Sequence, residues 1–260
     1  MGRAIALAFA AQGARVAVTD RDLPGAEDSL AAVIKAGGGG FVHGVDVTRD
    51  DDFAGLAERV QHEWGGLDVL VNNAGVATAG TVAQADIAQW RWVLEINLLG
   101  CVRGVQALAP MMVTQGYGHI VNIASFAGIA NPPAMASYNA AKAAVISLSE
   151  TLRFEMAPHG VGVSVACPSF FKTRLLETSR QQAAEDAAAP PMEGIVGRLM
   201  DKASVSADDV ARDIVKAVAQ QRFMVISHAD ARRLYGLKRL SPGLYFKMAR
   251  KATVGFLRVR

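Results

Sequence analysis

Alternating strand and helix patterns run along most of this chain, and they limit its fold more than any other feature. Short apolar runs such as "RVAVTD", "LDVLVNNAG" and "HIVNIAS" are typical of buried strands. Between them, "DDDFAGLAERVQHEWGG" and "SADDVARDIVKAVAQQ" have helical periodicity, and a longer helix is expected over about residues 84–115. This alternation predicts an α/β fold with a doubly wound parallel sheet and right-handed crossovers.

The composition fits one good-sized globular core. The chain has 260 residues, of which 51% are hydrophobic. Cys101 and Cys167 each lie in an apolar segment without metal-ligand spacing, so we expect buried free thiols in a reducing compartment and no metal site. No apolar run has the length of a transmembrane helix, and the short apolar start lacks the processing break of a signal peptide. A cytoplasmic location is therefore expected.

Charge is distributed unevenly, because every charged residue after Asp230 is basic. We expect one domain over residues 1–230 and a basic, amphipathic extension over residues 231–260. Three roles are open for this extension: contact with an anionic membrane surface, packing on a partner subunit, or a solvated tail. No nucleic-acid-binding motif or basic folded face is visible, so a nucleic-acid partner is not expected.

Polar or small residues stand where several predicted strands end. They are Asp20, Asp46, Asn72 to Gly75, Ser125 and the segment "CPSFFKT" that begins at Cys167. Ligands of open parallel sheets bind beyond the carboxyl ends of the strands. We therefore expect these residues to surround one binding site.

The segment "SYNAAK" places Tyr138 and Lys142 four residues apart near the start of a predicted helix, so both side chains leave the same face. A free tyrosine has a pKa near 10 and is a poor acid or base at neutral pH. A neighbouring ammonium lowers that pKa, which lets the phenol exchange a proton with an alcohol or carbonyl. Alone, such a pair is common in helices and carries little weight.

Two further polar residues strengthen this interpretation. Ser125 ends a strand and could hydrogen-bond the same substrate oxygen, although a serine there could also be a simple cap of the strand end. Asn97, in "EINLLG", is an amide within an apolar helix, where a local bend or a bound water would supply its partners. It could equally be a satisfied core amide. The joint occurrence of these residues favours a catalytic site.

The segments "NNAG", "EINLLG", "GHIVNIASFAG", "SYNAAK" and "CPSFFKT", in this order, resemble the short-chain dehydrogenase/reductase family over about residues 2–230. The resemblance implies a single Rossmann-like domain that transfers hydride between an alcohol or ketone and NAD or NADP. It also implies a homodimer or homotetramer.

The resemblance assigns roles to individual residues. Tyr138 would be the general acid/base, and Lys142 would bind the nicotinamide ribose and lower the tyrosine pKa. Ser125 would orient the substrate oxygen, and Asn97 would hold the water of a proton relay. The remaining cofactor contacts would be Gly2, Asp20, Arg21, Asp46, Val47, Asn73, Ala74, Gly75, Pro168, Ser169, Phe171 and Thr173. Ser169 departs from the family, which often has glycine after this proline, and its side chain could narrow the pocket.

The cofactor type depends on Asp20. A carboxylate at the end of this strand accepts hydrogen bonds from both ribose hydroxyls and repels a 2′-phosphate, which favours NAD over NADP. Arg21 weakens the inference, because an arginine can bind a phosphate or stack on adenine. The substrate is expected to be hydrophobic, and residues 178–202 could form either a lid over it or an ordinary surface insertion.

The start of the sequence matches only the end of the family's phosphate-binding loop, with Gly2 as its last glycine. The first strand and most of that loop are therefore expected to be missing, which would leave apolar strand edges exposed. The starting methionine could be internal to a longer gene, which we favour, or the chain could be truncated and bind its cofactor poorly. The alternative function is a non-catalytic protein that acts through subunit contacts.

Overall fold

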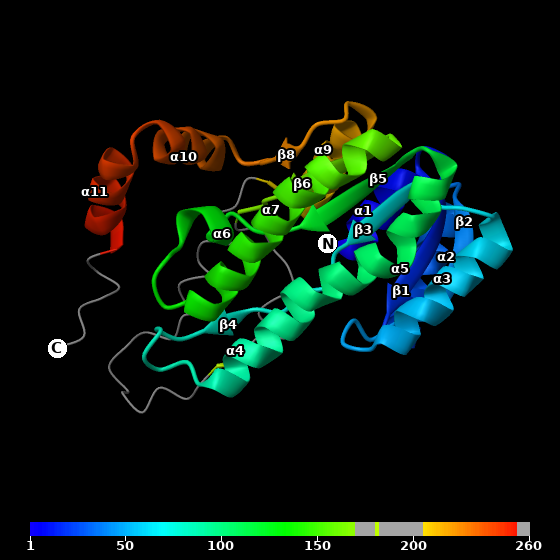
Figure 1. Cartoon of the computed structure of the whole chain (residues 1–260), viewed down its shortest axis with the longest axis horizontal. Coiled ribbons are helices and arrows are strands. Elements are labelled where there is room, and N and C mark those ends of the chain that lie inside the picture. The colour runs from blue at the N-terminus through cyan, green and yellow to red at the C-terminus, as the bar shows by residue number, and fades with distance from the viewer. Residues whose placement is uncertain (170–179, 182–204, 254–260) are drawn as a thin grey trace.

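The computed structural model describes residues 1–169, 180–181 and 205–253 (Figure 1). The strands are β1 (Arg15–Asp20), β2 (Gly39–Gly44), β3 (Val69–Asn72), β4 (Thr78–Ala79), β5 (Gly118–Ile123), β6 (Val161–Ala166), β7 (Arg180–Gln181) and β8 (Met224–Val225). The helices are α1 (Gly2–Ala10), α2 (Leu23–Lys35), α3 (Asp50–Trp64), α4 (Ile87–Leu94), α5 (Gly100–Gln115), α6 (Ala127–Ala130), α7 (Ala136–Met156), α9 (Ala207–Ala219), α10 (Ala229–Leu240) and α11 (Pro242–Thr253). The π-helical turn η1 (Glu95–Leu99) and the 3₁₀ turn η2 (Ala157–His159) complete the elements.

All the strand pairs are parallel, which confirms the predicted doubly wound α/β fold. In the described residues the strands form two main blocks, β1-β2 and β3-β5-β6-β8, with β4 and β7 pairing separately. The two blocks share no strand pair, so β1 and β3 each keep an edge without a partner strand among the described residues. Val16, Ala17 and Val18 of β1 are only half-buried, whereas most of β6 is buried. This difference agrees with the expected gap in the sheet.

One hydrophobic core joins the two blocks despite this gap. It contains Phe41 of β2 and Val60 of α3 together with Leu70 of β3, Met112 of α5 and Ile120 of β5. Met112 and Ile120 are completely buried. Packing through α3 and α5, rather than strand hydrogen bonds, therefore holds β1-β2 beside the larger sheet.

The expected long helix is continuous over Ile87–Gln115 and is made of α4, η1 and α5. It is the one described helix that is long and apolar enough to cross a membrane by length and composition. Its α5 part packs against α3, β3 and β5, as a helix covering a sheet does. These contacts account for its apolar composition.

The C-terminal part of the described chain forms an arm of two helices, α10 and α11, which pack on each other (Figure 1). α10 also contacts α6. The last described strand of the larger sheet, β8, is short and is confined to Met224–Val225. The predicted helix α9 begins with a capping box, in which the Ser206 and Asp209 side chains bond each other's backbone N–H groups.

Candidate active site

The parallel strands bring the predicted polar residues to one edge of each block. Asp20 is the last residue of β1, and Asp46 follows β2 closely. In the larger sheet Asn73 follows β3, Ser125 follows β5 and Pro168 follows β6. Because β3, β5 and β6 are hydrogen-bonded in sequence, the last three residues stand at the same carboxyl edge.

Tyr138 and Lys142 lie in the first turns of α7 and are almost completely buried, with 5% and 4% of their surface exposed. The Lys142 Nζ donates a hydrogen bond of 2.9 Å to the carbonyl oxygen of Ile123, and it lies 6.0 Å from the centroid of the Tyr138 ring. The sequence prediction that both side chains share one helix face is therefore confirmed. The ammonium is anchored to β5, whose end carries Ser125.

Burial controls the ionisation of this pair. It raises the pKa of Tyr138, and a hydrogen bond with the Ser125 side chain acts in the opposite direction. Burial also lowers the pKa of Lys142, although Cys101 and Cys167 oppose this effect. The expected lowering of the tyrosine pKa by Lys142 is not seen in this arrangement. The reason is that desolvation of the phenol outweighs every favourable contact on it.

Asn97 lies inside η1 and is completely buried. Its Oδ1 accepts a hydrogen bond of 2.8 Å from the Val76 N–H, and its Nδ2 donates one of 2.9 Å to the Val76 carbonyl. The side chain is thus satisfied by the segment after β3, which agrees with the core-amide alternative. A π-helical turn also interrupts the regular α-helix at this residue, which is a local irregularity at the position where a bend was expected.

A close approach of α6 to α7 fixes Ser125 relative to Lys142. The Ser125 Oγ accepts a hydrogen bond of 3.1 Å from the N–H of Ala127 at the start of α6. On the same helix, Gly128 lies so near α7 that a Cβ there would be 2.6 Å from the carbonyl carbon of Lys142. Only glycine allows this contact without displacing backbone.

The segment after β3 passes close to Asn97 and Lys142, because Gly75 has no side chain. A Cβ on Gly75 would lie 3.1 Å from Oδ1 of Asn97 and 3.3 Å from Nζ of Lys142, and one on Gly2 would lie 2.8 Å from Nδ2 of Asn73. The Oδ1 of Asn73 is buried without a hydrogen-bond partner among the described residues. Ala74 is exposed beside it. An unpaired buried oxygen beside glycines suits a flat, polar ligand, so these residues fit a dinucleotide.

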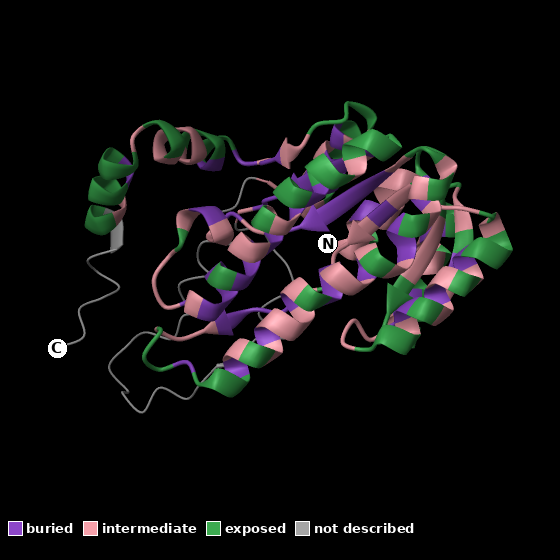
Figure 2. Ribbon diagram, in the orientation of Figure 1, coloured by how far each residue is buried: buried purple, intermediate pink, exposed green. Residues whose placement is uncertain are grey.

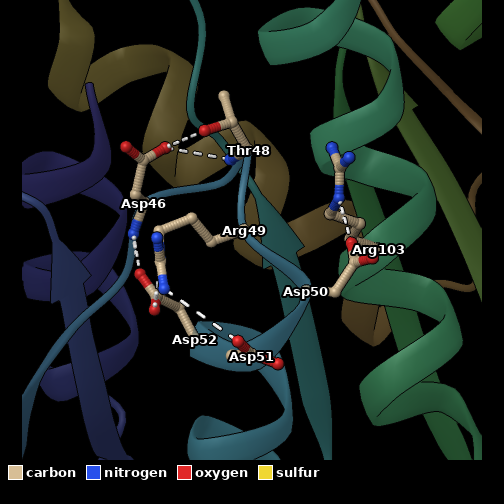
Figure 3. A network of polar contacts seen from close by, with 7 residues as sticks. All are labelled: Asp46, Thr48, Arg49, Asp50, Asp51, Asp52 and Arg103. Carbon is tan, nitrogen blue, oxygen red and sulfur yellow. Dashed lines mark hydrogen bonds and ion pairs between the residues drawn. The ribbon is translucent and has the colours of Figure 1, made fainter.

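The turn after β2 is held by a network of acids and arginines (Figure 3). Thr48 donates from its N–H and its hydroxyl to Oδ1 of Asp46, at 2.9 and 2.8 Å, and these bonds lower the pKa of Asp46. Asp52 accepts a hydrogen bond of 2.8 Å from the Asp46 N–H. Arg103 of α5 pairs with Asp50 and donates to the Val47 carbonyl at 3.2 Å. The Asp46–Val47 turn is thus fixed from both sides.

The two predicted determinants of cofactor type, Asp20 and Arg21, are exposed at the end of β1. The Asp20 Oδ1 accepts a hydrogen bond of 3.1 Å from the N–H of Asp22, which in turn caps α2 through Gly25. This bond uses one carboxylate oxygen and holds the side chain at the strand end. The other oxygen, Oδ2, is the one that could meet a ribose.

The predicted cofactor contacts that follow β6 are described only in part. The Pro168 carbonyl accepts a hydrogen bond of 2.9 Å from the Phe126 N–H, and the Ser169 N–H donates one of 3.3 Å to Nδ1 of His228. Phe171 and Thr173 lie outside the described residues, and so does the predicted lid at residues 178–202 apart from β7.

Sequence reasoning missed a buried polar chain behind the site. Asn72 donates to Asn122 at 2.9 Å, and Asn122 donates to Ser149 at 3.0 Å, linking β3, β5 and α7. Asn122 and Ser149 are completely buried. The sequence does show a polar residue within an otherwise apolar segment at these positions. Such a residue indicates a buried hydrogen bond, but it does not show which residue is the hydrogen-bond partner. The described residues contain no group of three side chains able to hold a metal ion.

Comparisons with known proteins agree with this geometry. A model of the short chain dehydrogenase family matches residues 1–184. The chain is 33% identical over 245 residues to "Probable oxidoreductase EphD" of Mycobacterium tuberculosis, an alignment that covers 93% of this chain. The alignment covers 41% of that relative, so the chain spans about two fifths of its length.

Two solved structures match this chain over about nine tenths of their own length. A short chain dehydrogenase/reductase from Burkholderia phymatum in complex with NAD has a TM-score of 0.83 and 32% identity, with 93% of this chain and 90% of that chain covered. A metagenomic short-chain oxidoreductase in complex with NADP has a TM-score of 0.66 and 30% identity, with 86% and 88% covered.

Proposed function

This chain belongs to the short-chain dehydrogenase family, and on that premise we propose that it interconverts an alcohol and a carbonyl with NAD(P). When bound, NAD(P) accepts or supplies the hydride at its nicotinamide ring. The observation that carries the proposal is the buried pair of Tyr138 and Lys142, with the Ser125 side chain near enough to the phenol to oppose the rise of its pKa. A phenol in that position can move the proton that accompanies a hydride transfer.

Tyr138 acts as the general acid/base in this proposal. During oxidation its oxygen takes the proton of the substrate hydroxyl, and during reduction it returns a proton to the carbonyl oxygen. Ser125, whose side chain influences the pKa of Tyr138, orients the substrate oxygen beside the phenol. Burial of Tyr138 keeps water from competing for the proton.

Lys142 and Asn97 support this proton transfer. An ammonium has three donors, and Ile123 takes one from Lys142, so the others can hold the ribose of the cofactor. Both polar atoms of the Asn97 amide are bound to Val76. The relay water is therefore assigned to the backbone carbonyl of Asn97, in a π-helical turn, and this carbonyl also accepts a hydrogen bond of 3.4 Å from the Cys101 Sγ.

The remaining predicted contacts form the cofactor site. Asn73, Ala74 and Gly75 line the cofactor beside the catalytic pair, and Pro168 and Ser169 cover the nicotinamide together with Phe171 and Thr173. Asp46 and Val47 flank the adenine. Asp20 binds the ribose hydroxyls, which favours NAD over NADP because its charge repels a 2′-phosphate. Gly2 and the first turn of α1 face the pyrophosphate.

The substrate is a hydrophobic alcohol or ketone in this proposal, and the enzyme acts in the cytoplasm as a homodimer or homotetramer. The apolar composition of residues 178–202 and of the C-terminal extension supports the substrate class. Relatives bound to NAD and to NADP support the cofactor class. The catalytic domain is proposed to end near residue 230.

The variant Tyr138→Phe tests the proposal, because it removes the proton-transferring oxygen and keeps the ring. General acid/base catalysis contributes about 10²- to 10⁴-fold, so turnover should fall at least a hundredfold with an alcohol substrate. The dissociation constant of NADH should stay within about threefold. Tyr117→Phe is the matched control, because Tyr117 is 57% exposed and distant from the site. Unchanged turnover in Tyr138→Phe would remove this residue from the mechanism.

A further inference from the structure

Exposed apolar side chains gather on the C-terminal arm formed by α10 and α11. The exposed fractions are 90% for Leu240, 49% for Leu244, 56% for Phe246 and 49% for Met248. Such a density of large apolar side chains on a short surface segment is unusual for a protein that meets only water. Figure 2 shows that this arm is mostly exposed.

The arm is nevertheless attached to the body by specific contacts. Tyr245 is 4% exposed, and its hydroxyl donates a hydrogen bond of 2.9 Å to the carbonyl oxygen of Ala130 in α6. Lys238 of α10 donates to the carbonyl oxygen of the neighbouring Ile129. These contacts bury one side of α11 and leave the opposite side facing outward.

Basic residues lie between the exposed apolar ones. Leu244, Met248 and Lys251 are spaced so that they share one face of α11, and Lys247 and Arg250 are exposed next to that face. No acidic residue follows Asp230 anywhere in the sequence. A surface with apolar groups and only positive charge is complementary to a surface with apolar groups and negative charge.

We propose that α11 and the end of α10 dock on an anionic lipid bilayer, with Leu240 of α10 and Leu244 and Met248 of α11 entering the headgroup region and Lys247 and Lys251 binding lipid phosphates. Amphipathic helices bind membrane surfaces through this combination of buried apolar area and electrostatic attraction. Because α11 is anchored to α6, which follows Ser125, docking would bring the candidate active site near the bilayer. This proposal is independent of the proposed catalytic function.

Co-sedimentation of the purified chain with vesicles tests the proposal. The chain should sediment with phosphatidylcholine vesicles that contain phosphatidylglycerol and stay in solution with pure phosphatidylcholine. The variant Lys247→Gln/Lys251→Gln should bind about 25-fold more weakly, since each cation near an anionic surface contributes about fivefold. Raising the salt from about 0.1 M to about 1 M should weaken binding of the original chain strongly.

Two further variants separate lipid binding by α11 from a general charge effect and from a subunit contact. Lys35→Gln/Lys216→Gln removes two lysines from α2 and α9 and should leave vesicle binding unchanged. Leu244→Ser/Met248→Ser should abolish vesicle binding while its melting temperature and its mass in sedimentation stay those of the original chain. If this variant instead changes the oligomeric mass, α11 is a subunit interface and the proposal is wrong. Equal binding to both kinds of vesicle, or to neither, would also overturn it.

Discussion

Replacing Gly128 by alanine tests how tightly α6 must approach α7 to hold the catalytic pair. The added Cβ would lie 2.6 Å from the carbonyl carbon of Lys142 and 2.7 Å from the N atom of Ala143. Both are backbone atoms of the long helix α7, so no side-chain rotation can relieve the overlap. Either α6 or the Lys142 turn of α7 must move.

The expected magnitude follows from the costs of overpacking. Forcing an extra carbon into a filled site costs about 1–3 kcal/mol, which corresponds to about 2–12 °C in melting temperature for a domain of this size. Movement of the Lys142 turn also displaces Tyr138, and a shift of about 1 Å at a catalytic group can reduce the rate about a hundredfold. A hundredfold loss of rate corresponds to about 2.7 kcal/mol, so we expect effects of similar size on turnover and on stability.

Thermal denaturation and steady-state kinetics of Gly128→Ala measure both effects. Gly236→Ala is the matched control, because Gly236 lies in α10 and a Cβ there would meet no atom within 4 Å. Alanine is the better helix former by up to about 1 kcal/mol, so this control should be as stable as the original chain or slightly more stable. If Gly128→Ala behaves like the control in both assays, the close contact of α6 with α7 does not position Lys142.

Two further perturbations address the buried polar groups of the site. Asn97→Ala should lower the free energy of unfolding in urea by about 2–6 kcal/mol, because it leaves the buried N–H and carbonyl of Val76 without partners at about 1–3 kcal/mol each. A loss below about 1 kcal/mol would show that Asn97 does not hold this segment. The rate of alcohol oxidation should rise with pH above neutrality, because burial raises the pKa of Tyr138 and only its deprotonated form accepts the substrate proton. The rate of ketone reduction should fall over the same range, and pH–rate profiles with the same pH dependence in both directions would contradict this role.

The sequence predicted the parts of the fold that depend on local patterns. Apolar runs defined β1, β3 and β5, and helical periodicity defined α3 and α9. The rule that ligands lie at the carboxyl ends of parallel strands placed Ser125 and Pro168 at one edge from the sequence alone. The doubly wound fold and the family membership are confirmed, whereas the individual roles of the site residues stay predictions.

Features that depend on long-range packing could not be read from the sequence. The buried amide Asn97 suggested a bend or a water, but its partner Val76 lies 21 positions away in the chain. The sequence predicted a lowered pKa for Tyr138, whereas burial raises it. The sequence shows the neighbouring lysine but not how deeply the phenol is buried. The contact of Gly128 with α7 was missed for the same reason, since a glycine in a short apolar segment does not show what it touches.

Binding of the reduced cofactors to the purified chain tests the central claim most directly. Calorimetric titration should give one saturable site per chain for NADH, and NADPH should bind at least tenfold more weakly because the Asp20 carboxylate repels the 2′-phosphate. The variant Asp20→Ala should bring the two dissociation constants close together. If neither NADH nor NADPH binds at millimolar concentration, the chain does not hold a nicotinamide cofactor at this site, and the proposed oxidoreductase activity is wrong.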